Sequence, residues 1–315
     1  MMEDRVVIAS NHRDSHNEII TKEALDMMAE TANGPRKVRW GVEHKRQLPP
    51  LGRAEDAKVE EREGYYYLTV RQVEYDTYEP VAWNSDLIKA SFSDDQSPFV
   101  EPEFEPPSRL ELSIDPNDFK SRSAYDEYID YLGKLNSDLD TNEFGRKALL
   151  NDPEVVLRVA EYYLLYKFLT PVLSDTVKKV SDSISTKIAQ DSGKLYDLIR
   201  NSMKEMILRI NQKNRPINYV IKFPSESEIE LFARTRNPEI LINALKDKKV
   251  RKLRSGIDEI RSHTDFEKIQ FILTDKGKWT FNYLLTSKGE AIGRRVTFKK
   301  RDRVLEYISK NKGKK

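Results

Sequence analysis

A lone histidine, His44, is the side chain of this sequence best placed to accept a proton in a reaction. Apolar residues alternate with polar ones at 38–42, which predicts a short strand just before the histidine. Pro49 and Pro50 exclude a helix after it, and Gly52 gives the backbone the freedom to turn into the next strand. The imidazole is therefore expected on rigid scaffolding, either as a general base or as a half-buried cap of a strand.

Two serines in a later predicted strand, KASFS at 89–93, offer hydroxyls that such a base could activate. A serine attacks a carbonyl when an imidazole within hydrogen-bond reach removes its proton and backbone N–H groups stabilise the oxyanion. Ser91 follows His44 by 47 positions, a separation that suits neighbouring strands. The alternative is a buried strand serine whose hydroxyl is satisfied by its neighbours.

A second group of side chains, in the loop at 11–19, has the residue types of a metal site. It holds His12, Asp14, His16 and Glu18. Histidines four apart bind zinc together when a helix places them on one face, but no helix is predicted before Thr21. The spacing therefore favours a turn, and neither a metal nor another cofactor is expected.

The elements that must position these residues are strands around one helix. Thr21 is the predicted N-cap of a helix that runs to Ala32, and Asn33-Gly34-Pro35 ends it. The remaining pattern predicts a buried strand at 5–10, a hairpin of 57–61 and 65–75 around Glu63-Gly64, a loop at 77–82, a short helix or turn at 83–89 and a strand at 109–114.

The order of these segments resembles the prohead maturation proteases of tailed bacteriophages, which share a herpesvirus assemblin-like β-barrel. The resemblance rests on D-x-x-x-E-I-I-T-x-E-A-L, V-E-H-x-x-x-x-P-P-L-G-R, A-S-F-S and R-L-E-L-S-I-D-P-N, and it covers residues 5–117. It implies an antiparallel barrel in which His44 is the general base, Ser91 the nucleophile and Glu111 the acidic partner of the imidazole. It also implies capsid or scaffold proteins as substrates and allows a homo-oligomer.

One position departs from the pattern of that family. The glycine expected after the serine is missing, because Phe92 and Ser93 follow Ser91. Ser93 therefore competes for the role of nucleophile, and the backbone near it lacks the residue that would open an oxyanion hole. The departure favours the alternative in which the barrel is retained without catalysis, as a structural or recognition module of a virion or another large assembly.

Composition places the chain among charged proteins with a core. It has 315 residues, 38% of them hydrophobic and 34% charged, which suits two domains. The absence of cysteine excludes disulfides and thiolate metal sites. No apolar run near the N-terminus is long enough for a signal peptide, so a cytoplasmic location is expected, in the host or in a virion if the protein is viral.

The second part of the chain reads as helical, which gives an α+β protein with a barrel domain at 1–122 and a mainly helical assembly or targeting region at 123–315. Helical spacing covers 123–139, 152–169, 174–212, 225–233 and 237–253, and a hairpin is predicted within 268–286 around Asp275-Lys276-Gly277. The aromatic segment at 152–169 carries charges and is too short to span a membrane. A buried packing helix is favoured there over a helix on a membrane surface.

Charge is distributed unevenly along the chain. The formal net charge is +2, but residues 94–143 hold 14 acidic and 4 basic side chains, whereas 244–315 hold 9 acidic and 21 basic ones. The basic residues crowd into 294–303 and the tail beyond. Such a cluster binds nucleic acid in some proteins. The other interpretations are a solvated face and a docking surface for an acidic partner.

The sequence is consistent with two functions. The first is a serine endopeptidase of capsid maturation. The second is an inactive member that keeps the fold for recognition and uses its basic C-terminus as a contact surface.

Overall fold

The computed structural model describes residues 5–13, 19–42, 45–100, 105–144, 152–170, 181–211 and 214–312. The chain forms two compact units. The first unit combines Met1–Pro102 with Tyr283–Lys315, and the second comprises Glu103–Asn282. Both mix helices and strands, so the predicted α+β class is confirmed. Helices are interspersed with strands in both units rather than collected in a C-terminal region.

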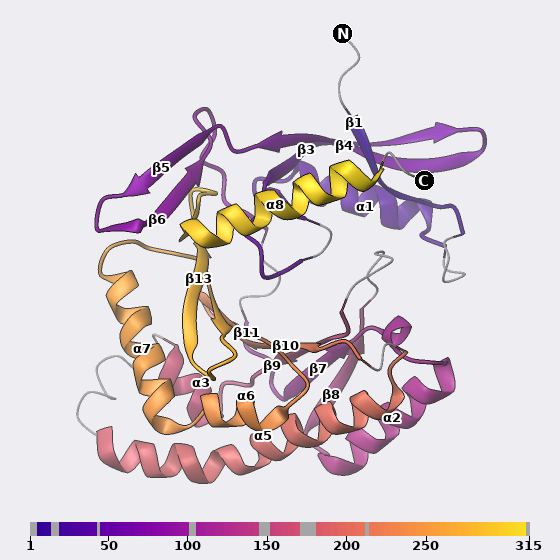
Figure 1. Ribbon diagram of the computed structural model, residues 1–315. Coiled ribbons are helices and arrows are strands. Elements are labelled where there is room, and N and C mark those ends of the chain that lie inside the picture. The colour runs from indigo at the N-terminus through magenta and orange to yellow at the C-terminus, as the bar shows by residue number, and fades with distance from the viewer. Residues whose placement is uncertain are drawn as a thin grey trace. The chain divides into compact units, whose positions relative to one another are not determined.

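The N-terminal part of the first unit is a curled four-stranded antiparallel half-barrel with the order β1-β4-β3-β2 (Figure 1). Helix α1, Lys22–Asn33, packs Leu25 and Ala32 against the sheet. Thr21 caps this helix, because its Oγ1 accepts a hydrogen bond from the backbone N–H of Ala24 at 3.2 Å. The strands are β1 Arg5–Ser10, β2 Val38–Trp40, β3 Gly52–Arg62 and β4 Tyr65–Glu74.

The turn between β3 and β4 lies where the sequence predicts it. Glu63 and Gly64 both have positive φ, as a two-residue hairpin turn requires. The prediction of a fully buried first strand is wrong, because β1 lies at an edge of the sheet and has β4 as its one neighbour among the described strands. Val7 is 49% exposed and Ile8 39%.

Three further strands and a helix complete the first unit: β5 Thr77–Val81, β6 Asn84–Ser91, β14 Ala291–Arg294 and α8 Arg295–Lys312. The loop predicted at 77–82 and the helix or turn predicted at 83–89 are therefore wrong. Strand β6 pairs in antiparallel fashion with β5 on one side and with β14 on the other. This long-range pairing with β14, about 200 positions along the chain, overrides local propensity.

The second unit contains most of a mixed sheet of ten strands. Its strands follow the order β13-β12-β11-β10-β9-β7-β8, and β13 continues into the first unit, where β14, β6 and β5 follow it. Parallel pairs (β7 with β8, β9 with β10, β11 with β12) alternate with antiparallel ones (β7 with β9, β10 with β11). The strands are β7 Leu110–Ile114, β8 Leu139–Glu143, β9 Glu154–Arg158, β10 Ile217–Phe223, β11 Glu228–Thr235, β12 Lys268–Leu273 and β13 Trp279–Leu285.

Helices cover one face of the sheet of the second unit (Figure 1). Tyr219 of β10 points toward the longest of them, because its hydroxyl lies 3.1 Å from Ser202 Oγ. Leu195, Ile199 and Met203 on that helix are fully buried. The helices are η1 Pro116–Asp118, α2 Arg122–Leu135, α3 Leu164–Leu169, α5 Ser181–Arg209, α6 Pro238–Ala244 and α7 Asp247–Arg261.

The prediction of a mainly helical region after residue 122 is wrong, because strands β8 to β14 lie in it. Residues 154–158, predicted as helix, form β9, whose β-branched side chains pack between β7 and β10. Residues 228–235 form β11 instead of the predicted helix. The hairpin within 268–286 is confirmed, and Gly277 in its turn has φ +65°. No helix in the described ranges is long and apolar enough to cross a membrane.

Candidate functional site

The segment that carries the predicted general base is held against helix α8, within the first unit. His44 itself lies outside the described residues. Around it, Val42, Leu48 and Leu51 form a buried apolar cluster with residues of α8. Buried apolar residues therefore precede and follow the position of the histidine in the sequence.

The two candidate nucleophiles lie in different surroundings. Ser91 ends β6 opposite Thr77, is half-buried, and its hydroxyl makes no hydrogen bond within the described part of the chain. Ser93 is exposed and bound to Asp76, whose Oδ2 accepts from the Ser93 hydroxyl at 2.8 Å and from its backbone N–H at 3.1 Å. Hydrogen bonds from Ser93 and Thr77 lower the pKa of Asp76. Ser93 thus serves to hold this turn.

The predicted acidic partner, Glu111, lies on β7 in the second unit. Its carboxylate accepts a hydrogen bond from Arg158 on the adjacent strand β9 and forms an ion pair with it. Arg158 also donates to the carbonyl oxygen of Glu105 at 3.1 Å. Ser91 belongs to the first unit, so the predicted triad is divided between the two units.

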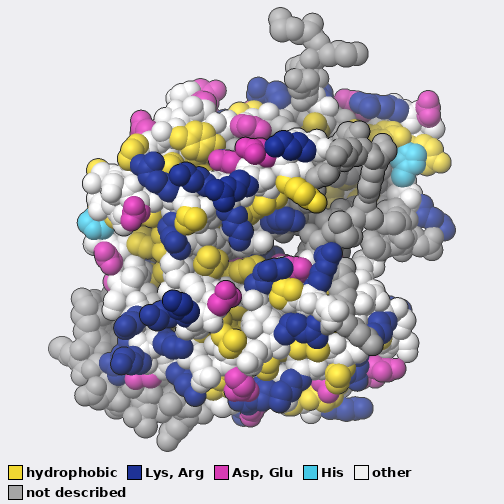
Figure 2. All heavy atoms as spheres, viewed as in Figure 1, with side chains coloured by type: hydrophobic (Ala, Val, Ile, Leu, Met, Phe, Trp, Pro, Cys, Tyr) yellow, Lys and Arg dark blue, Asp and Glu magenta, His cyan; other side chains and the backbone are white. Residues whose placement is uncertain are grey.

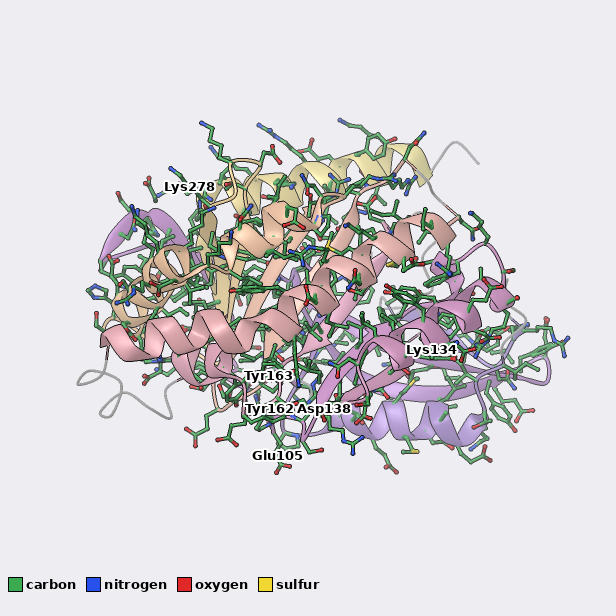
Figure 3. All side chains as sticks on the ribbon, turned by 90° about the horizontal axis from the view of Figure 1, so that it is seen from below. Glu105, Lys134, Asp138, Tyr162, Tyr163 and Lys278 are labelled. Atoms are coloured by element: carbon green, nitrogen blue, oxygen red, sulfur yellow. The ribbon has the colours of Figure 1, made fainter. Side chains whose placement is uncertain are left out.

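At the end of the sheet where β7 pairs with β8, a polar cluster joins the start of β8 to the segment before α3. The Tyr162 hydroxyl donates to Asp138, and its ring lies 4.7 Å from that of Tyr163 (Figure 3). Burial and the hydrogen bond to Asp138 raise the pKa of Tyr162. Arg109 Nε lies 3.7 Å from the same carboxylate. Asp138 is thus engaged by two neighbours, which indicates a structural role.

Helix α8 is fixed to the first unit by one apolar face and one arginine. Phe298 packs into a buried cluster with Tyr75 and Phe92, and Val304, Leu305 and Ile308 pack on the segment around His44. Arg301 is 3% exposed and donates from Nη1 to the carbonyl oxygen of Pro50 at 2.8 Å. Its other terminal nitrogen donates to the Tyr78 hydroxyl at 3.2 Å. These contacts leave the opposite face of the helix to solvent.

That opposite face is basic. Residues 294–310 hold seven Lys and Arg side chains but only two acidic ones, Asp302 and Glu306. Figure 2 shows Lys and Arg side chains gathered along the ridge that α8 forms. Arg295, Lys299 and Arg303 are exposed and four residues apart, and the ring of Tyr307, the next residue at this spacing, is 70% exposed. We call this set the α8 surface: Arg295, Lys299, Lys300, Arg303 and Lys310, with Tyr307.

Most cations of the α8 surface carry an uncompensated charge. Lys299, Lys300, Arg303 and Lys310 have no ion-pair partner among the described residues. Arg295 donates to the carbonyl oxygen of Ser85, which is uncharged. The nearest acid in sequence, Asp302, already pairs with the buried Arg301 at 3.0 Å. The surface therefore presents a concentrated positive potential.

A charge network in the sheet of the second unit is the feature that sequence reasoning missed. Lys268 Nζ lies 3.0 Å from Glu228 and 3.1 Å from Glu230, and Lys222 Nζ lies 3.0 Å from Glu228. Amides extend the network, since Gln270 donates to Glu230 at 2.6 Å. Every member is at most 6% exposed: Lys222, Glu228, Glu230, Lys268, Gln270 and Asn282.

The network compensates its own charges. Burial by itself raises the pKa of Glu228, but the positive charges of Lys268 and Lys222 outweigh it, so this pKa lies below its ordinary value. Two lysines face two carboxylates, and no group of His, Asp and Glu suited to a metal ion occurs in the described ranges. The arrangement is that of a buried ion-pair cluster that fixes the register of four strands.

Comparison with known proteins assigns the chain to no family. No protein-family model matches the sequence, and no significant match exists among curated proteins or solved structures.

Proposed function

We propose that this protein is a recognition module that binds nucleic acid through the α8 surface. The supporting observation is the row of exposed cations without acidic partners on one face of a firmly anchored helix. Residues four apart lie on one helix face and differ by a rise of about 6 Å, so Arg295, Lys299 and Arg303 form a line of charges. Such a line is suited to contact successive phosphates of a nucleic-acid backbone.

The composition of the surface favours nucleic acid over an acidic protein or a membrane. Lysine is depleted in interfaces between proteins, whereas interfaces with nucleic acid are strongly positive. A helix that lies on a membrane needs an exposed apolar face. Most apolar residues of α8 pack within the first unit instead, namely Phe298, Val304, Leu305 and Ile308. Val296, which is 55% exposed, does not by itself make an apolar face. Tyr307 adds an exposed ring on which a base can stack.

Binding of a labelled 20-base-pair duplex, followed by fluorescence anisotropy at about 100 mM salt, tests this function. The variant Lys299→Gln/Lys300→Gln/Arg303→Gln should bind at least about tenfold more weakly than the wild type, because several phosphate contacts are lost. Lys134→Gln, an exposed change on α2, is the matched control and should bind as the wild type does. Equal affinities for the triple variant and the control would reject the proposal.

A serine endopeptidase, as the resemblance to prohead proteases implies, is the second proposal. The observation that favours it is the hydroxyl of Ser91, which is half-buried at a strand end and has no hydrogen bond within the described part of the chain. Ser93, by contrast, is bound to Asp76. Ser91 is therefore the better nucleophile of the two, with His44 as general base.

Self-cleavage of purified protein, followed by mass spectrometry, tests the second proposal. Activity that disappears in both Ser91→Ala and His44→Ala, but persists in Ser93→Ala, would support it. Turnover that all three variants retain would exclude this site.

A further inference from the structure

Tyr307 is the most exposed of the tyrosine, phenylalanine and tryptophan residues in the described part of the chain. It is 70% exposed, whereas the other exposed tyrosines are less than half exposed. Each of those three packs on a neighbouring ring: Tyr65 on His12, Tyr78 on Phe298 and Tyr162 on Tyr163. An aromatic side chain buries about 150–250 Å² when it belongs to a core, so a ring as exposed as that of Tyr307 adds little to the stability of the fold.

The ring of Tyr307 lies beside cations of the α8 surface. Tyr307 follows Arg303 by four positions and Lys300 by seven, the spacing of residues that share one face of a helix. Glu306, the acid next to it in sequence, is turned about 100° away around the helix axis, and Asp302 about 140°. The two acids of α8 therefore lie off the row that carries the ring and its neighbouring cations.

A phosphate held by Arg303 would lie close to a base held by Tyr307. The two residues differ by a rise of about 6 Å along α8. One nucleotide of a strand advances by about 3.4 Å in a duplex. The rise therefore corresponds to about two nucleotides, so neighbouring nucleotides of one strand can reach both side chains.

The bases of a duplex are poorly available to such a ring. They are stacked on one another and show only their edges in the grooves. An unpaired base presents its whole face, and aromatic side chains bind single-stranded nucleic acid by stacking on such faces. Every base has such a face, so stacking depends little on sequence. An exposed ring beside phosphate-binding cations therefore selects for unpaired nucleotides rather than for a base sequence.

We propose that the α8 surface recognises nucleic acid that has a single-stranded segment, one base of which stacks on Tyr307. The inference rests on the proposed function, because Lys300 and Arg303 hold the adjoining phosphates. A fully paired duplex still binds, since it offers phosphates to the same cations, but it lacks the stacking contact. The cations thus provide affinity for any nucleic acid, and the ring provides the preference for unpaired bases.

Overhangs with and without bases separate these two contributions. One strand of a labelled 20-base-pair duplex is extended by about six nucleotides at both ends, which supplies a 3′ and a 5′ overhang. A second ligand has the same duplex and the same phosphates, but its overhangs are abasic. Fluorescence anisotropy at about 100 mM salt compares the two ligands for the wild type and for three variants that circular dichroism shows to be folded.

Two of the variants differ only in the ring. Tyr307→Leu removes the ring and keeps an apolar side chain, whereas Tyr307→Phe keeps the ring and is the matched control. The third variant, Lys299→Gln/Lys300→Gln/Arg303→Gln, removes the phosphate contacts and keeps the ring.

The wild type should bind the overhangs that have bases about tenfold more tightly than the abasic ones, because stacking on an aromatic ring has an effect of this order. Tyr307→Leu should lose this preference, and Tyr307→Phe should keep it. The triple variant should bind both ligands at least about tenfold more weakly than the wild type does.

Failure of this inference differs from failure of the proposed function. Equal binding of the two ligands by the wild type, or a preference that Tyr307→Leu retains, would overturn the role of Tyr307. The proposed function would still stand if the triple variant lost affinity for both ligands. Full affinity of the triple variant would reject the proposed function and this inference with it.

Discussion

Arg301 and Arg303 lie two positions apart on α8 and perform opposite tasks. Arg301 donates to the carbonyl oxygen of Pro50 at 2.8 Å and is 3% exposed. Arg303 is exposed and has no ion-pair partner among the described residues. One arginine anchors the helix to the first unit, and the other is available to a ligand.

Replacing these two arginines should separate stability from binding. Arg301→Met removes a buried guanidinium together with its hydrogen bonds to Pro50, Tyr78 and Asp302, so it should lower the free energy of unfolding by about 2–4 kcal/mol. Arg303→Met should change it by less than about 0.5 kcal/mol, as surface substitutions usually do, while weakening binding to duplex DNA. Urea denaturation and anisotropy measure the two effects. Equal losses of stability in the two variants would contradict the assignment.

The buried network predicts a large cost for removing a single lysine. Lys268→Met leaves Glu228 and Glu230 buried with one fewer cation and should cost about 3–5 kcal/mol. Lys252→Met, at an exposed position of the same unit, is the control and should be nearly neutral. Thermal denaturation of both proteins checks the difference.

Stability should also depend on pH through Glu228. Its pKa lies below the ordinary value of 4.5 because Lys268 and Lys222 outweigh the effect of burial. As the pH falls, the unfolded chain takes up this proton before the folded one does. The ionised carboxylate therefore contributes its full stability above about pH 4.5, and this contribution is lost as the pH falls through the lower folded-state pKa.

Urea midpoints measured from pH 7 to pH 3 test this dependence. Glu228→Gln should be less stable than the wild type at pH 7, and the difference should shrink toward pH 3, because the wild-type carboxyl is then protonated as well. A difference that stays constant over this range would show that Glu228 does not titrate as described.

Gly52 is required for a reason other than turn freedom. A Cβ at this position would lie 1.9 Å from the carbonyl oxygen of Val73, so the close approach of β3 to β4 excludes a side chain. Gly52→Ala should therefore lower the melting temperature by at least about 8 °C, roughly the effect of 2–3 kcal/mol in a chain of this size. Gly133→Ala, in an exposed part of α2 with open space around it, should raise stability by about 0.5–1 kcal/mol.

Local patterns predicted the elements that local chemistry determines. Thr21 as N-cap predicted the bounds of helix α1 to within one residue. The turn residues at 63–64 and 275–277 predicted the positions of two hairpins. The prediction of a helix where β11 lies was wrong. Ser225 and Glu228 have the spacing of a capping box, which is typical of the start of a helix. Pairing of β11 with two neighbouring strands decided its conformation instead, and no local pattern contains that pairing.

The sequence predicted that the C-terminal segment is basic, but not which of its cations are exposed. The run of basic residues at 294–303 indicated a contact surface. Only the packing of α8 separates its buried arginine from its exposed cations. The buried network had a pattern of its own, because Glu228 and Glu230 alternate with Ile229 and Leu231, and a strand interpretation would have placed both carboxylates on one face.

Lysine footprinting measures most directly whether α8 contacts nucleic acid. The protein is acetylated briefly with and without a saturating duplex, and the modification of each lysine is quantified by mass spectrometry. Lys299 and Lys300 should lose most of their reactivity in the complex, while Lys134 on α2 stays as reactive as in the free protein. Unchanged reactivity of Lys299 and Lys300 in a saturated complex would contradict the assignment of α8 as the binding surface.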